Sequence, residues 1–170
     1  MKYIKSINKF RIKGLLEIEL DPFCDERGEI WSLHETCNIF PTFVEDKVTI
    51  SKKNVLRGLH GDNETDKLIC CLSGEILLSV VDYRKGSSTF GAFECFKLSS
   101  KAPKIIFVPA GCLNGHLCLS EECVFFYKWS KKYDGPENQF TIKWNDPTIN
   151  IPWPIENPIL SKRDQEGNLL

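Results

Sequence analysis

The segment Arg57-Gly58-Leu59-His60-Gly61-Asp62 places a histidine among charged side chains rather than inside an apolar run. Lys67 follows where a strongly apolar run begins. A histidine at the polar lip of a pocket can act as a general base, because its ordinary pKa lies close to neutral pH. The spacing alone fits a histidine with a purely structural role equally well.

A metal centre is one alternative for this histidine. The sequence has only three histidines, His34, His60 and His116, and it has no Cys-x-x-Cys pair. A metal-dependent β-barrel enzyme usually offers clustered histidine and carboxylate ligands. Asp62 or Glu64 could join His60 as ligands, but the pattern favours a site with no metal and no cofactor.

Charge and composition narrow the class of protein. The chain has 22 basic and 23 acidic residues, and this balance argues against a general nucleic-acid or membrane-surface binder. No apolar run approaches the roughly 20 residues that span a bilayer, and the N-terminal residues do not resemble a signal peptide. Most of the eight cysteines sit inside apolar runs such as LICCLSGEILL and CVFFY. Such cysteines behave as small buried hydrophobes, so we expect reduced thiols and a cytoplasmic location.

Short apolar runs separated by turn residues must position these groups. Residues 67–84 predict two strands hinged at Ser73-Gly74, and four more strands are predicted within 90–99, 104–111, 115–120 and 122–130. This spacing is typical of an all-β sandwich or barrel. A helix is predicted over 33–40, a strand-like run over 13–20, and an extended strap from residue 145 onward. The whole chain, 1–170, is expected to be a single domain.

Seven motifs follow one another from about residue 22 to residue 164: DPFCDERGEIW, SKKNVLRGLHGD, KLICCLSGEILLSVVDYRKGSSTFG, VPAGCLNGHLCLS, YKWSKKYDGPE, WNDPTINIPWP and ILSKRD. Their order and spacing resemble those of the dTDP-4-dehydrorhamnose 3,5-epimerase family. The resemblance implies a cupin-type jelly roll with a few short helices. It also implies metal-free catalysis by a homodimer in which each subunit acts on a nucleotide-linked 4-keto sugar.

The resemblance also implies roles for individual residues. His60 corresponds to the catalytic base and Asp164 to the carboxylate that pairs with it, while Tyr127 corresponds to the acid. Lys67 corresponds to the lysine that opens the next strand. The substrate-binding positions, among them two phosphate-binding arginines and a tyrosine near the nucleotide, fall on Arg27, Glu29, Arg57 and Tyr133.

These residue types suit the implied reaction. The hydrogens at C3 and C5 of a 4-keto sugar are α to a carbonyl, so inversion removes a proton from one face and returns one to the other. A neutral histidine can take the proton, and a carboxylate can stabilise the imidazolium that forms. A lysine can stabilise the enolate oxygen, and a tyrosine can return a proton from the opposite face. Arginine forks suit the diphosphate.

Three positions depart from the family pattern. Asp62 stands where the family usually has glutamine. Asn114 replaces a family histidine, with His116 two places further on, where it could enter the same cavity or simply line the barrel. Gln139 replaces a glutamate near the nucleotide base, and a carboxamide both donates and accepts hydrogen bonds.

Together these departures resemble a subgroup that acts on GDP-linked 4-keto-heptoses in capsular polysaccharide synthesis. A GDP-4-keto-heptose is therefore the preferred substrate, and a dTDP-4-keto-6-deoxyhexose is the alternative. Whether C3 alone or both C3 and C5 invert stays open. Two other activities remain possible from the residues, namely a 3,4-ketoisomerase and a sugar-nucleotide-binding cupin without catalysis.

Overall fold

The computed structural model describes residues 3–34 and 39–170, and most of its regular structure is β-strand. The elements are β1 (Ile4–Lys9), β2 (Leu16–Leu20), β3 (Phe23–Asp25), β4 (Gly28–Ile30), β5 (Glu45–Lys52), β6 (Leu56–Gly61), β7 (Lys67–Ser73), β8 (Glu75–Asp82), β9 (Phe93–Ser99), β10 (Lys104–Val108), β11 (Cys112–Cys118), β12 (Glu122–Trp129), the 3-10 turn η1 (Pro136–Asn138), β13 (Phe140–Thr141) and α1 (Lys162–Gln165).

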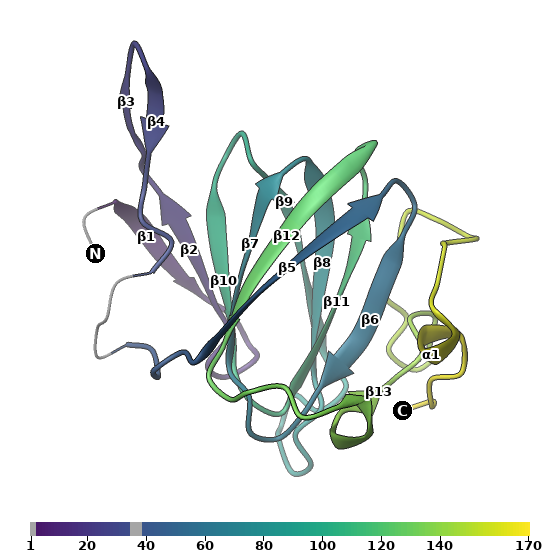
Figure 1. Cartoon of the computed structure of the whole chain (residues 1–170). Helices are drawn as coiled ribbons and strands as arrows, with labels where there is room; N and C mark the ends of the chain where they lie inside the picture. The colour runs from purple at the N-terminus through teal and green to yellow at the C-terminus, as the bar shows by residue number, and fades with distance from the viewer. Residues whose placement is uncertain (1–2, 35–38) are drawn as a thin grey trace.

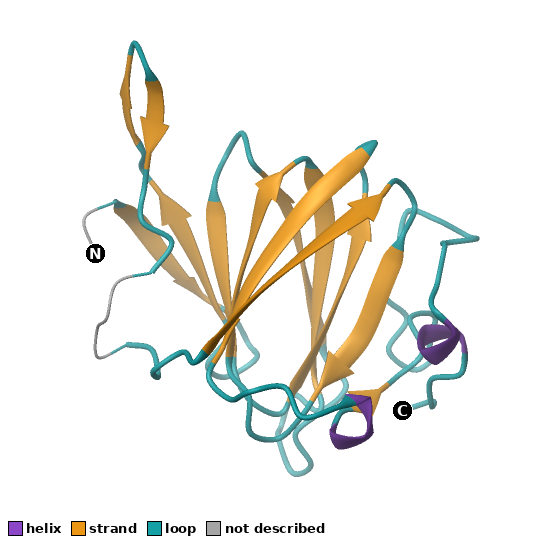
Figure 2. Cartoon of the chain, in the orientation of Figure 1, coloured by secondary structure: helices purple, strands orange, loops and turns teal. Residues whose placement is uncertain are grey.

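Two antiparallel sheets face each other and form the body of the molecule (Figure 1). The first sheet has the order β1-β2-β10-β7-β12-β5, and the second has the order β13-β6-β11-β8-β9. Strands β3 and β4 form a separate hairpin that projects from the body. The predicted cupin-type jelly roll is confirmed. Figure 2 shows how little of the described chain is helical, and none of its helices is long and apolar enough to cross a membrane.

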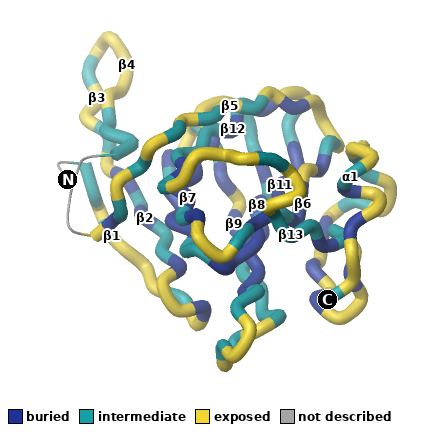
Figure 3. The backbone as a smooth tube through the Cα atoms, turned by 60° about the horizontal axis from the view of Figure 1, so that its bottom comes forward, coloured by how far each residue is buried: buried dark blue, intermediate teal, exposed yellow. Residues whose placement is uncertain are grey.

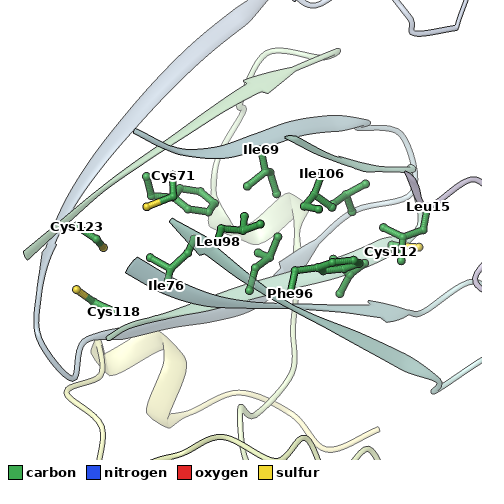
Figure 4. Packing of buried hydrophobic residues seen from close by; sticks show 14 of the residues in the cluster. Leu15, Ile69, Cys71, Ile76, Phe96, Leu98, Ile106, Cys112, Cys118 and Cys123 are labelled. Carbon is green, nitrogen blue, oxygen red and sulfur yellow. The ribbon is translucent and has the colours of Figure 1, made fainter. Parts of the chain in front are cut away.

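The main core lies between the two sheets (Figure 4). The sequence of β7 is apolar at nearly every position, and its packing explains why. Ile69 and Cys71 point into this core, whereas Leu68 and Cys70 belong to a second cluster on the opposite face of the sheet. Phe40 belongs to that second cluster and Trp31 packs against it. Because both faces of β7 are covered, apolar side chains occupy both sets of alternate positions.

Two glycine positions decide the local course of the chain. Gly74 joins β7 to β8 with φ +78°, and a Cβ there would lie 2.3 Å from the carbonyl oxygen of Glu122. Gly58 lets β6 approach β11, since a Cβ at Gly58 would lie 2.5 Å from the Cα of Gly115. This close approach brings the strands that carry His60 and His116 side by side.

The segment that follows β13 packs as an extended strap over the second sheet. Ile149, Ile151 and Trp153 join Leu56 of β6 in one buried cluster. Asp146 is buried and accepts hydrogen bonds from the backbone N–H groups of residues 148, 149 and 170. The strap then places α1 beside β6. The predicted extended strap is confirmed, with one short helix within it.

The predicted strands within 67–84, 90–99, 104–111, 115–120 and 122–130 all occur. The run over 13–20 forms a strand only from Leu16, because residues 11–14 make a turn that leads into the β1–β2 pair. The predicted helix over 33–40 falls partly on residues 35–38, which lie outside the described residues, and the described residues of that range are not helical.

The described cysteines are all free thiols, and most of them are buried as expected. Cys24 and Cys95 are the exposed ones, and Cys37 lies outside the described residues. Figure 3 shows the burial of the described residues along the backbone, with buried stretches in the sheets and a largely exposed β3–β4 hairpin.

Candidate active site

A cavity of about 350 Å³ is lined by side chains from β5, β6, β7, β11 and β12, from the segment after β12, and from residues 161–164 around α1. This volume falls in the usual range for small-molecule sites. Nearly all of the predicted site residues line it: Arg57, His60, Lys67, Asn114, His116, Tyr127, Tyr133, Gln139 and Asp164. The structure therefore brings together residues from six separate segments of the chain.

Two of the predicted residues do not reach this cavity. Arg27 and Glu29 lie on the β3–β4 hairpin and line a separate hollow there. Arg27 is highly exposed, and its guanidinium is paired with Asp25 of the same hairpin. The expectation that Arg27 contributes to the site is therefore not met within a single chain.

His60 and Asp164 form a close pair at the cavity wall. Nε2 of His60 lies 2.6 Å from Oδ1 of Asp164. Ser161, the N-cap of α1, donates its hydroxyl to Oδ2 of Asp164 at 2.7 Å. A carboxylate beside Nε2 favours a proton on that nitrogen, which leaves the lone pair on Nδ1.

Burial lowers the pKa of His60, and the adjacent Asp164 only partly offsets this effect. Arg163 and Lys67 lower the same pKa further. Burial alone would raise the pKa of Asp164, but its interactions with His60 and Ser161 hold it below the ordinary value. His60 is therefore neutral, and Asp164 ionised, at neutral pH.

Lys67 lies at the start of β7 and is buried. Its ammonium donates hydrogen bonds to Oδ1 of Asn114 at 2.8 Å and to the carbonyl oxygen of His60 at 3.3 Å. Burial lowers the pKa of Lys67 to about 8. Because an ammonium only donates, Asn114 must turn its oxygen toward Lys67, and its NH₂ group is left for other partners.

His116 lines the cavity, and its side chain is buried. The ring stacks on Phe125 with centroids 4.1 Å apart and an interplanar angle of 9°. Burial lowers the pKa of His116 to about 3, so the ring stays neutral. Of the two possibilities left open by the sequence, His116 does enter the cavity wall, but as a neutral group.

Tyr127 reaches the cavity from β12, where it packs against Phe125 and Trp129. Burial raises its pKa, so the phenol is protonated at neutral pH and is able to donate. Arg57 is anchored by a hydrogen bond from its Nε to Oγ of Ser51 at 3.0 Å.

Gln139 is held at the mouth of the cavity by Arg163, which donates to its Oε1 from both terminal nitrogens at 3.4 Å. Arg163 is itself fixed by a hydrogen bond to Thr141 at 2.8 Å. Nε2 of Gln139 is buried and has no hydrogen-bond partner. The same is true of one polar side-chain atom in each of Thr49, His116 and Trp129, which line the same cavity. Buried polar groups are normally paired, so this wall is built to receive a polar ligand.

Sequence reasoning missed several lining residues, notably Lys47, Thr49, Trp129 and Arg163. Lys47 and Thr49 alternate along residues 45–52, which is the spacing of side chains on one face of a strand. Arg163 directly precedes the predicted Asp164. These two signals were available, whereas the place of Trp129 in the wall depends on tertiary packing.

Comparisons with known proteins agree with this arrangement. The family model described as dTDP-4-dehydrorhamnose 3,5-epimerase matches residues 9–170. The enzyme of that name from Salmonella typhimurium is 38% identical over 172 residues, which cover 95% of this chain and 93% of the relative. Its namesake from Methanothermobacter thermautotrophicus is 35% identical over 92% of this chain and 90% of the relative.

A solved structure of dTDP-6-deoxy-D-glucose-3,5-epimerase from Legionella pneumophila, in complex with dTDP-4-keto-L-rhamnose, superposes with a TM-score of 0.90. It is 34% identical, and the match covers 96% of this chain and 92% of that one. These findings support the predicted family and the dTDP alternative. They do not support the preferred GDP-heptose substrate or a role in capsule synthesis.

Proposed function

Because this chain belongs to the dTDP-4-dehydrorhamnose 3,5-epimerase family and is an epimerase of nucleotide-linked 4-keto sugars, we propose that its substrate is a dTDP-linked 4-keto-6-deoxyhexose. The substrates named for its relatives support this choice. The observation that carries the mechanism is the close His60–Asp164 pair, which shares one cavity with Tyr127 and Lys67.

In this mechanism His60 removes the proton. Nδ1 carries the lone pair and takes the hydrogen at C3 or C5, which the neighbouring carbonyl acidifies. The positive charge that forms on the imidazole is stabilised by Asp164 at 2.6 Å. Because burial lowers the pKa of His60, the ring begins the reaction as a neutral base.

Tyr127 returns a proton from the other face of the sugar ring. Its raised pKa keeps the phenol protonated before the reaction, so it can serve as a donor. Inversion then follows because removal and return occur on opposite faces. If return came from the His60 side instead, the original configuration would be restored.

Asn114 and Lys67 stabilise the enolate oxygen at C4. The Asn114 NH₂ group is free because Lys67 holds its oxygen. A donor aimed at a developing negative charge stabilises the transition state more than the ground state, and the nearby ammonium strengthens that donor. Arg57 supplies a cation for the diphosphate from the neighbouring strand.

The test is incubation with dTDP- and GDP-linked 4-keto sugars in deuterated buffer. Mass spectrometry reads deuterium incorporation at the exchanged carbons, and NMR reads the configuration of the product. We expect exchange and inversion with the dTDP sugar. Movement of the carbonyl to C3 would mean a ketoisomerase, and binding without exchange would mean a cupin that only binds. Either result contradicts the proposal. The same spectra show whether C3 alone or both carbons invert.

A GDP-linked 4-keto-heptose is a second candidate substrate. It is favoured by two departures from the family pattern, Gln139 in place of a glutamate near the nucleotide base and Asn114 in place of a histidine. Faster turnover of the GDP sugar than of the dTDP sugar, at equal concentration, would select this candidate and reject the dTDP one.

We also propose that the enzyme works as a homodimer. The β3–β4 hairpin exposes Phe23 and Ile30 by 56% and 59%, and Arg27 at its tip lies outside the chain's own cavity. Large apolar side chains on a projecting arm suit contact with another subunit, where Arg27 could meet the diphosphate. Mixing inactive His60→Asn and Arg27→Ala subunits should restore activity, since one site per mixed dimer would be intact. No recovery after subunit exchange would contradict a shared site.

A further inference from the structure

Lys47 is a cation in the cavity wall that the proposed mechanism does not use. It lies on β5, directly opposite Tyr127 in the β5–β12 register, so both side chains lie on the same face of the sheet. Its side chain is 22% exposed. Lys47 is therefore next to the proposed acid and within reach of solvent and ligand.

The ammonium of Lys47 rests on aromatic rings. It lies 3.9 Å from the ring centroid of Tyr133 and 4.4 Å from that of Trp129. Its anionic partner is Glu45, at 3.3 Å. The other carboxylate oxygen of Glu45 accepts the backbone N–H of Tyr133 at 2.6 Å. Glu45 thus also holds the segment that carries Tyr133, whereas Lys47 is held by this ion pair and by its contacts with the two rings.

The cavity around Lys47 carries an excess of positive charge, which favours binding of an anion. Arg57, Lys67 and Arg163 also line the cavity, and within residues 3–34 and 39–170 none of them forms an ion pair with a carboxylate. Lys67 lies 5.0 Å from the Trp129 ring, so two ammonium groups share one indole. Glu45 pairs with Lys47 and Asp164 lies beside His60, so the four cations that line the cavity outnumber the carboxylates near them, and like charges repel each other.

We infer that Lys47 binds the diphosphate of the nucleotide-linked substrate, moving onto it from its resting place on the Tyr133 and Trp129 rings. This inference rests on the proposed function. The four-carbon stem of lysine lets the ammonium leave the rings without backbone movement. Its departure also frees a face of Tyr133, which is 39% exposed, for a nucleobase. Binding of phosphate and stacking of base are then coupled through one side chain.

The test compares Lys47→Met, which keeps the apolar stem, with Lys47→Arg, which keeps the charge. Lys97→Met is the matched control, because Lys97 also pairs with one carboxylate, at 3.1 Å, but on the outer strand β9. Calorimetric titrations use dTDP, GDP, thymidine and guanosine. We expect Lys47→Met to weaken binding of the better diphosphate about 10- to 100-fold, with less than about a twofold change for its nucleoside. Lys47→Arg and Lys97→Met should stay close to the parent protein.

Equal diphosphate affinity in Lys47→Met and the parent protein would overturn the inference. So would an equal loss for nucleoside and diphosphate, since that pattern marks a brace for Tyr133 rather than a phosphate contact. If the parent protein epimerises a 4-keto sugar but Lys47→Met leaves its KM unchanged, the inference fails while the proposed function stands. If neither nucleoside diphosphate binds the parent protein, the inference fails whatever the catalytic result.

Discussion

Oδ1 of Asp164 lies 2.6 Å from Nε2 of His60, with the carboxylate 2% exposed and the histidine 23% exposed. The carboxylate is thus almost fully buried, whereas the ring is the more accessible member of the pair. This difference in exposure suits the histidine to meet a substrate hydrogen and the carboxylate to stabilise the ring from behind.

Replacing His60 by asparagine should abolish most exchange and inversion. A general base contributes roughly 10²–10⁴-fold to a rate, so the loss should be at least about 100-fold. Binding of the nucleoside diphosphate should persist, because asparagine fits the space. Deuterium incorporation measured by mass spectrometry checks the rate. A variant that keeps more than about a tenth of the parent rate would remove His60 from the role of base.

Asp164→Asn tests the pair from the other side. The carboxylate raises the pKa of His60 against the effect of burial, so its removal should lower that pKa further. The acid limb of kcat/KM lies below pH 6.5 in the parent enzyme, since the pKa of His60 is lowered from 6.5. It should move to still lower pH in the variant, with a rate at least about tenfold lower at every pH. An acid limb that does not move would separate Asp164 from the base.

Tyr127→Phe should separate removal of the proton from its return. His60 can still form the enolate, so the α-hydrogen should continue to exchange with solvent deuterium. Inversion should fall much further, because the donor on the opposite face is lost. The ring remains, so packing against Phe125 should change little. Mass spectrometry and NMR on one sample read both quantities. Equal losses of exchange and inversion would rule out a dedicated acid on the opposite face.

Lys67 predicts an alkaline limit to activity. Its pKa is lowered to about 8 by burial, so the ammonium loses its proton as the pH rises through this value. The positive charge beside the enolate oxygen is then lost, and turnover should decline above about pH 8. Lys67→Met should lower kcat about 100-fold and remove that alkaline limb. A variant that keeps the same limb would assign the ionisation to another group.

Activity should survive thorough chelation. The described residues include no group of three histidine, cysteine or acidic side chains placed to hold a metal ion, and the enolate oxygen has Asn114 and Lys67 as neighbours in the proposed mechanism. Exchange rates before and after dialysis against a chelator, with metal content measured by mass spectrometry, check this. Rate loss that returns on addition of a stoichiometric metal would contradict the mechanism.

Strands with apolar faces were predictable, and those with polar faces were not. Residues 67–84 contain two apolar runs around Gly74, and both strands form. Residues 45–52 escaped prediction because β5 turns Lys47 and Thr49 toward the cavity and leaves Val48 and Ile50 exposed on its other side. Because the inward positions of β5 are polar and its apolar side chains face outward, it is not one of the apolar runs from which the other strands were predicted.

The same distinction applies to the site. Residues within recognisable motifs, such as His60 and Asp164, could be placed from the sequence and do lie together. The contact of Lys47 with two rings could not be predicted, since Trp129 and Tyr133 come from a different part of the chain. Arg27 could be named but not located, because its position depends on a hairpin that leaves the body of its own chain.

The strap that carries Asp164 has a consequence for the order of events during synthesis on the ribosome. His60 emerges with β6 in the first half of the chain, whereas Asp164 follows all the strands of both sheets. A nascent chain can therefore pair its strands while His60 still has no carboxylate beside it. The N-terminal part of a chain leaves the ribosome first, so strands of the sheets can pair before the catalytic pair is complete. The active site is therefore completed late, when the strap packs over the second sheet and the hydrogen bonds of Asp146 hold it there.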